Sequence, residues 1–82
     1  MQEDQLIQGL RARDKKTVDY LYEKYSRALL GVIFRIISDQ DIAEEVFHDA
    51  FIKITRKIDS YEESKGRLYT WMAHICRNSA ID

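Results

Sequence analysis

The feature that most constrains the fold is a long helical periodicity that no helix-breaking residue interrupts. The chain of 82 residues contains no proline and only three glycines, and these two residue types most often end regular elements. Apolar side chains recur at three- and four-residue spacing along residues 18–36, which is the period of one buried helix face. We therefore expect a central helix over residues 14–37. Its buried face is predicted to comprise Val18, Leu21, Tyr22, Tyr25, Ala28, Leu29, Val32, Ile33 and Ile36.

The rest of the chain shows the same periodicity in three shorter stretches. Helices are expected at about 2–12, 40–57 and 67–82, with a polar loop at about 59–66. Asp14 can cap the helix that follows it, and Ser38 or Asp39 can cap the next one, because their oxygens accept hydrogen bonds from free amides at a helix start. The sequence therefore predicts an all-α fold, a compact helical bundle of three to four helices.

The composition fits one folded domain over residues 1–82. Hydrophobic residues make up 45% of the chain and charged residues 33%, which suits a buried core with a solvated surface. No apolar run approaches the ~20 residues of a transmembrane helix, and the N-terminus lacks a signal-peptide pattern, so no membrane insertion is expected. The single cysteine, Cys76, fits a reducing cytosol. The helical pattern is still intact at Asp82, which leads us to expect a domain of a longer protein.

Residues that could support catalysis or metal binding are sparse. His74 and Cys76 are two positions apart on the expected helix, so their side chains point about 200° apart, and His48 has no ligand partner four positions away. The sequence has no glycine-rich phosphate loop and no nucleophile elbow. We therefore expect no enzyme activity, no metal and no cofactor, with Cys76 as a small buried side chain.

The helix expected at 40–57 has two different faces. Phe47, Phe51 and Ile54 follow the core period, whereas the opposite face is acidic and contains one apolar residue. An isoleucine ringed by carboxylates indicates a surface for a basic partner with a hydrophobic centre. The alternative is a solvated acidic face with one incidental apolar residue. The outer face consists of Asp41, Glu45, His48, Asp49 and Ile52.

The segment KGRLYTWMAHICRN, residues 65–78, contains the only tryptophan. Tyr69 and Trp71 are two positions apart on a helix and cannot both enter one core, so one of them is expected to be partly exposed. Aromatic rings, cations and amide donors are the groups that proteins use on unpaired bases, although a single tryptophan is also commonly a core anchor. The outer face of this helix carries Thr70, His74, Arg77 and Asn78.

The second half of the chain resembles a known family. Residues 41–82 resemble region 2 of the bacterial sigma-70 family of RNA polymerase sigma factors, and most closely its extracytoplasmic-function (ECF, group IV) branch. The order of motifs agrees: an acidic helix with AEEVFHDAFIKI, then TRKIDSY, a polar loop, and a helix with tryptophan that ends in RNSAID. The preceding VDYLYEKYSRALLGVIFRI is similar to the first long helix of that region, so the resemblance covers essentially the whole chain.

The resemblance implies a transcription initiation factor whose acidic helix docks on the clamp helices of the polymerase β′ subunit. Charge pairs would steer this association, and Ile52 would desolvate its centre. The contact residues implied are Asp41, Glu45, His48, Asp49 and Ile52.

The resemblance also implies that the loop and the last helix open the promoter −10 element and capture a flipped base of the single-stranded non-template strand. Trp71 matches the aromatic position of the family, where it either stacks on DNA or braces the loop from below. Phosphate contacts would come from Lys53, Arg56, Lys57, Arg67 and Arg77. The base pocket would be formed by Ser60, Tyr61 and the rest of the loop, with Tyr69, Thr70 and His74 nearby. Lys65 and Asn78 are further residues expected to contact DNA.

Region 4, the helix-turn-helix that reads the −35 element, has no counterpart in this sequence, so we expect an isolated region 2 domain. The partners implied are RNA polymerase core, promoter DNA and an anti-sigma protein, in the bacterial cytoplasm and at the nucleoid. The alternative function is a helical protein-interaction adaptor without nucleic-acid binding. In that case Trp71 is a core anchor, and the basic residues only compensate helix ends.

Overall fold

The computed structural model describes residues 1–82 as four α-helices joined by short turns, which confirms the expected all-α fold. The helices are α1 (Glu3–Arg11), α2 (Lys15–Phe34), α3 (Gln40–Arg56) and α4 (Leu68–Ile81). Two short 3-10 turns, η1 (Ile58–Ser60) and η2 (Glu63–Lys65), lie in the polar loop between α3 and α4.

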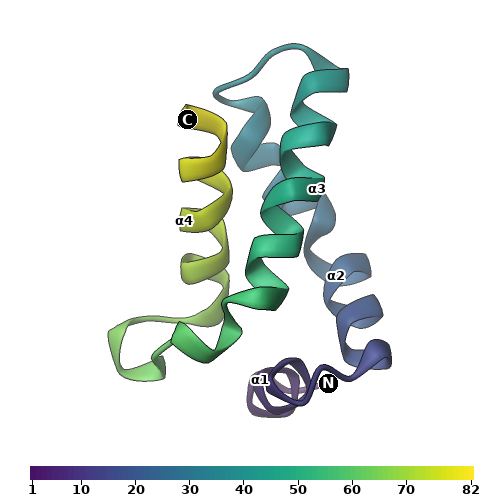
Figure 1. Cartoon of the computed structure of the whole chain (residues 1–82), viewed down its shortest axis with the longest axis vertical. Coiled ribbons are helices and arrows are strands. Elements are labelled where there is room, and N and C mark those ends of the chain that lie inside the picture. Colours follow the sequence, from purple (N-terminus) through teal and green to yellow (C-terminus); the bar gives the residue numbers. More distant parts are fainter.

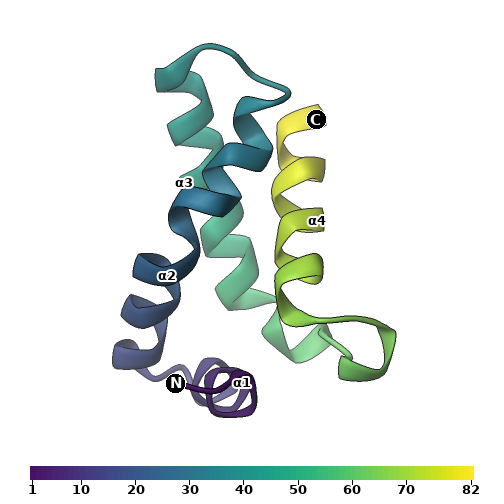
Figure 2. The ribbon, with the colours of Figure 1, turned by 180° about the vertical axis from the view of Figure 1, so that it is seen from behind.

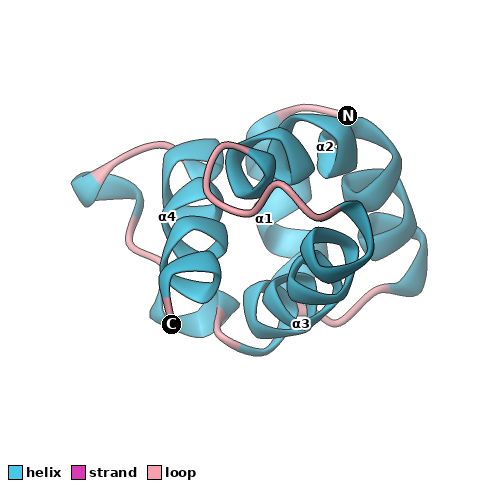
Figure 3. Ribbon diagram, turned by 90° about the horizontal axis from the view of Figure 1, so that it is seen from above, coloured by secondary structure: helices cyan, strands magenta, loops and turns pink.

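Helices α2, α3 and α4 run along the long axis of the molecule, and each packs against the other two. Helix α1 lies across one end of this group, where Figures 1 and 2 show it nearly end-on. Seen along the long axis in Figure 3, the three long helices surround a common centre. The loop with η1 and η2 lies at the same end of the molecule as α1.

The starts of the two longest helices follow the capping chemistry expected from the sequence. Asp14 Oδ2 accepts a hydrogen bond from the Thr17 amide at 3.1 Å and another from the Thr17 hydroxyl at 2.7 Å. Asp39, rather than Ser38, caps α3 and accepts from the Ile42 amide at 3.1 Å. Each carboxylate satisfies an amide that has no partner within its helix and places negative charge at the positive helix end.

The core lies where the inner faces of all four helices meet. Tyr61 and Ile58 extend it beneath the loop between α3 and α4. Its buried apolar residues are Leu6, Ile7, Leu10, Leu21, Leu29, Ile33, Ala43, Phe47, Ala50, Ile54, Ile58, Tyr61, Leu68, Met72 and Cys76.

Three residues expected on the buried face of α2 are exposed instead. Helix α2 ends at Phe34, so Ile36 lies in the following turn and its side chain is exposed. Tyr22 lies at the edge of the core, where its ring contacts Phe47 and Phe51 at centroid distances of 5.8 and 5.3 Å. Ala28 is also exposed to solvent. The buried face of α2 is therefore narrower than the face predicted from the spacing of apolar residues, and these three positions lie at its margins.

Helix α1 crosses the start of α2 at close range. Gly9 of α1 faces the buried Thr17 of α2 with no room for a side chain between them. The glycine thus allows the two backbones to approach, which fixes α1 against the end of the bundle. None of the helices is both long enough and apolar enough to cross a membrane.

Candidate functional site

A pocket of about 250 Å³ opens between the loop that precedes α4 and the first two turns of α4. It is smaller than the roughly 300–1,000 Å³ of sites for drug-sized ligands, so it suits a small ligand group. Seven of the residues predicted to contact DNA line it. The lining residues are Ser60, Tyr61, Glu62, Lys65, Gly66, Arg67, Thr70, Trp71 and His74.

A side-chain hydrogen bond joins the two ends of the loop that forms one wall of the pocket. The Tyr61 hydroxyl donates a hydrogen bond to the Gly66 carbonyl at 2.8 Å. Gly66 has a φ of 150°, a backbone conformation that residues with a Cβ rarely adopt. The chain therefore turns at Gly66 and brings Arg67 to the start of α4, beside the loop.

Tyr61 is a supporting residue more than an exposed contact. Only 3% of the residue remains exposed, and its ring packs on the Trp71 indole at 5.4 Å between ring centroids. Burial, followed by the nearby Glu3 and Glu63 carboxylates, raises the pKa of the Tyr61 hydroxyl. The phenol therefore stays protonated and keeps its hydrogen bond to Gly66.

The two aromatic residues of α4 have different positions. Trp71 is half-buried, packs against the core and lines the pocket. Tyr69 is the exposed member of the pair, and its ring lies 6.0 Å from that of Tyr25, outside the pocket. The expectation that one of the two is partly exposed is confirmed.

Charged groups surround the mouth of the pocket. Lys65 Nζ lies 3.5 Å from a Glu62 carboxylate oxygen, and Arg67 Nη2 lies 3.7 Å from Glu3 Oε1. Both cationic side chains are largely exposed, so these ion pairs are weak and leave the cations available to another anion. Thr70 and His74 add hydrogen-bonding groups from successive turns of α4. The pocket thus combines an aromatic wall, polar groups and exposed cations.

The remaining residues predicted to contact DNA lie on the surface outside the pocket. Lys53 Nζ reaches Ser79 Oγ on α4 at 3.4 Å, which places this lysine between the two helices. All five side chains are exposed, and their role as phosphate or base contacts stays a prediction. They are Lys53, Arg56 and Lys57 near the end of α3, and Arg77 and Asn78 on α4.

The outer face of α3 is exposed along its whole length. Ile52 is 47% exposed and Ile42 is 50% exposed, at opposite ends of an acidic stretch. Residues 42, 45, 49 and 52 follow the three- and four-residue spacing of one helix face. Ile42 was not among the residues predicted for this face, although its spacing from Glu45 and Asp49 places it there. The predicted contact residues Asp41, Glu45, His48, Asp49 and Ile52 are all exposed.

A groove of about 440 Å³ lies between α2 and α3, next to this face. His48 belongs to both surfaces, because it is one of the exposed residues of α3 and also lines the groove. The groove has Arg27 and Glu44 on opposite helices, with apolar side chains between them. Its lining residues are Tyr22, Ser26, Arg27, Leu30, Glu44, Phe47 and His48.

Groups that could hold a metal ion do not come together. No three histidine, cysteine, aspartate or glutamate side chains are arranged as ligands. Cys76 is buried in α4, and burial raises the pKa of its thiol to about 11. The predicted small buried role of Cys76 is confirmed.

Comparison with known proteins identifies one family and several relatives. The sequence profile of the family described as Sigma-70 region 2 matches residues 21–82. The RNA polymerase sigma-H factor of Pseudomonas aeruginosa is 34% identical over 79 residues, which cover 96% of this chain and 40% of that protein. The ECF RNA polymerase sigma-E factor of Haemophilus influenzae is 32% identical over 75 residues, covering 92% of this chain and 39% of that protein.

A more distant relative shows the same pattern of coverage. The ECF RNA polymerase sigma factor SigM of Bacillus subtilis is 27% identical over 66 residues, which cover 80% of this chain and 39% of that protein. The chain therefore spans about two fifths of the length of the curated relatives that it matches.

Proposed function

Because this chain belongs to the sigma-70 family, as a region 2 of the ECF branch, we propose that it acts in transcription initiation by binding RNA polymerase and promoter DNA. One surface, the outer face of α3, binds the clamp helices of the polymerase β′ subunit. A second surface, the pocket beside Trp71, takes up one flipped base of the non-template −10 strand. The proposed role is binding and strand separation, without catalysis.

The observation that carries this proposal is the composition of the pocket. It joins Trp71 with two polar residues of α4, Thr70 and His74, and with the cations Lys65 and Arg67 at its mouth. An unpaired base needs an aromatic or apolar surface against its ring and hydrogen-bonding groups at its edge. Its phosphates need nearby cations. The pocket offers all three kinds of group.

The proposed binding surface on α3 is supported by its charge and exposed apolar area. Two isoleucines, Ile42 and Ile52, lie exposed with Glu45 and Asp49 between them on one face of α3. Such a face suits a partner that is basic around an apolar centre, because carboxylates steer association and the isoleucines lose water on contact. The groove that His48 shares with α2 can receive a side chain from the same partner.

The overall charge is compatible with DNA binding because the charges are segregated. The formal net charge is −1, yet the acidic face of α3 and the cations around the pocket occupy different surfaces. The DNA affinity of the domain alone is therefore expected to be modest and to decrease with salt. Contacts made by polymerase would supply the remaining affinity.

The test uses Trp71 as the probe, since it is the only tryptophan. Short single-stranded homopolymers of each base are titrated into the domain at low and moderate salt. We expect indole fluorescence to change with at least one of them, and Lys65→Ala to weaken the binding. Lys16→Ala is the matched control, because it removes an exposed lysine from α2, outside the pocket.

The adaptor function remains the competing explanation. It is favoured by the two exposed isoleucines of α3, which need a protein partner but no nucleic acid. A folded domain that binds the polymerase fragment but leaves Trp71 fluorescence unchanged with every strand would establish the adaptor and refute base capture.

A further inference from the structure

Helix α1 and the turn that follows it make three polar contacts with the segment that forms the pocket. Arg11 Nη2 donates to the Tyr61 carbonyl at 3.2 Å, and Arg13 Nη2 lies 3.3 Å from Asp59 Oδ2. Glu3 Oε1 pairs with Arg67 Nη2 at 3.7 Å. The contacts reach residues 59 and 61 at one end of the segment and residue 67 at the other. They join parts of the chain that are 46 and 50 residues apart in the two arginine contacts.

These contacts matter because the segment has no other distant hydrogen bonds. Within residues 59–66 the remaining hydrogen bonds are local: Ser60 bonds to the Lys57 carbonyl, and Tyr61 bonds to Ile58 and Gly66. The two 3-10 turns are likewise closed by bonds between residues three apart. Tyr61 anchors the start of the segment in the core, but residues 62–66 are exposed and held only by local bonds. The contacts from residues 11 and 13 are therefore the distant hydrogen bonds that restrain the segment.

Arg13 occupies a backbone position that normally selects glycine. The Asp14 amide bonds to the Gly9 carbonyl at 2.9 Å, and the Arg13 amide bonds to the Leu10 carbonyl at 3.1 Å, which together end α1 in a Schellman motif. Arg13 takes the left-handed position of this motif with a φ of 59°, and no other residue except glycine has a positive φ. Such conformations are unfavourable for residues with a Cβ and persist where the surroundings impose them.

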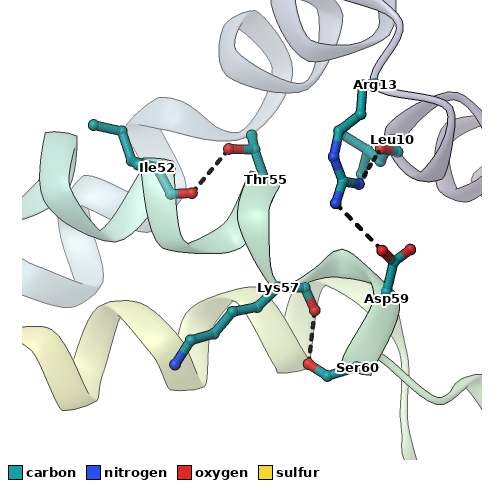
Figure 4. A network of polar contacts seen from close by, with 7 residues as sticks. All are labelled: Leu10, Arg13, Ile52, Thr55, Lys57, Asp59 and Ser60. Carbon is teal, nitrogen blue, oxygen red and sulfur yellow. Dashed lines mark hydrogen bonds and ion pairs between the residues drawn. The ribbon is translucent and has the colours of Figure 1, made fainter.

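The side chain of Arg13 explains why an arginine is useful at this position. Its guanidinium donates from Nη1 to the Leu10 carbonyl at 3.1 Å and from Nη2 to Asp59. Figure 4 shows the guanidinium between these two partners, with one dashed line to each. A glycine would satisfy the backbone but would leave Asp59 without this contact.

Arg11, two residues before Arg13, makes its contact closer to the pocket. The carbonyl that it binds belongs to Tyr61, whose ring packs on Trp71 and whose hydroxyl holds Gly66. A shift of the Tyr61 backbone would therefore move two residues that line the pocket, Trp71 and Gly66.

We propose that α1 and the turn after it are a positioning element for the base pocket. They act mainly through Arg11 and Arg13 on Tyr61 and Asp59, and the weak Glu3–Arg67 pair adds little. This inference rests on the proposed function for its ligand, an unpaired base. Glu3, Arg11 and Arg13 do not line the pocket; the contacts of the two arginines order its wall before the base arrives. A wall that is already ordered reduces the entropic cost of ordering it when the base binds.

The first part of the test measures the free protein. Arg13→Gly removes the contact to Asp59 and relieves the left-handed backbone, so its thermal midpoint is expected to stay unchanged or to rise. Hydrogen exchange at amides 60–66 and acrylamide quenching of Trp71 are expected to increase despite that. Unchanged exchange and quenching in both Arg13→Gly and Arg11→Met would overturn the inference, whether or not DNA binds.

The second part measures affinity for the single strand that the wild-type domain binds best. Asp59→Ala removes a negative charge, so electrostatics alone predicts tighter binding to DNA. Loss of the positioning contact predicts weaker binding instead, by roughly three- to tenfold, the effect of ordering one or two side chains only upon association. Tighter binding by Asp59→Ala would contradict the inference.

A double variant separates this inference from the proposed function. Arg13→Gly combined with Asp59→Ala is expected to lose no more affinity than Arg13→Gly alone, because both changes remove the same contact. If the two effects add independently, the contact does not position the pocket. If the wild type binds no strand while Arg13→Gly still loosens the loop, base capture fails, and the positioning of the pocket by α1 stands.

Discussion

At the scale of single residues, Cys76 illustrates how burial controls reactivity. This residue of α4 is buried in the core, and burial raises the pKa of its thiol to about 11 from an ordinary value of 9.0. The thiolate, which is the reactive form, is therefore almost absent at neutral pH. We expect iodoacetamide to label the folded domain far more slowly than the urea-unfolded chain. Equal rates would show that the thiol is accessible in the folded state.

The same shift gives a pH dependence of stability. Because the folded-state pKa is raised, the folded protein holds the thiol proton more tightly than the unfolded chain. The contribution of the buried thiol to stability is complete below about pH 9 and is lost as the pH rises toward 11. Cys76→Ala is expected to reduce this alkaline loss in urea unfolding measured across that range.

Two glycines in helices offer a matched pair of predictions. A Cβ at Gly9 would lie 2.6 Å from Thr17 Cγ2 and closer still to its hydroxyl, whereas a Cβ at Gly31 would meet no atom within 4 Å. Thr17 is buried and bonded to Asp14, so it has little freedom to yield. We expect Gly9→Ala to lower the free energy of unfolding by about 1–3 kcal/mol.

Gly31→Ala is the control for that substitution. It removes backbone entropy from the unfolded chain at an open helical site, so we expect stabilisation of about 0.5–1 kcal/mol. Urea denaturation of both variants measures the difference. Destabilisation of similar size in both would mean that general helix effects, and not the contact of α1 with α2, determine the result.

At the scale of elements, the outer face of α3 should act as one surface. Ile52→Gln removes exposed apolar area and introduces glutamine, which favours the helix. The free energy of unfolding should therefore change by less than about 0.5 kcal/mol. Binding to a purified fragment of the β′ clamp helices should nevertheless weaken by roughly tenfold, or about 1.4 kcal/mol. Asp49→Arg should weaken it further, because it places a cation against a basic partner.

A charge reversal elsewhere distinguishes local contact from overall charge. Glu23→Arg changes the net charge as Asp49→Arg does, but on the exposed surface of α2. We expect near wild-type binding for Glu23→Arg, measured by titration calorimetry at moderate salt. Equal losses in the two variants would assign the interaction to overall charge and not to α3.

The helices were predictable from the sequence because their information is local. Periodic apolar residues indicated each helix, and Asp14 and Asp39 marked the starts of α2 and α3. The end of α2 was less predictable. Ile36 continues the apolar period, yet its amide bonds to Ile33 in a tight turn after the helix has ended at Phe34. Periodicity does not register such a change of backbone geometry.

At the scale of the whole molecule, the arrangement of α1 was not predictable from the sequence. No local pattern tells that Arg11 reaches the Tyr61 carbonyl or that Arg13 reaches Asp59, because these pairs depend on how α1 crosses the bundle. The members of the pocket were largely anticipated, through the family resemblance and the aromatic segment. What the sequence left open was whether Trp71 was in the core or in the pocket, and the structure places it in contact with both.

The most direct measurement of the central claim is an abasic scan of the single strand that the domain binds best. Each nucleotide is replaced in turn by an abasic one, and affinity is followed through Trp71 fluorescence. Capture of one base predicts that a single position weakens binding by about 1–3 kcal/mol, or roughly five- to over a hundredfold, while most other positions change it little. A small and uniform loss along the whole strand would contradict base capture and indicate binding through phosphates alone.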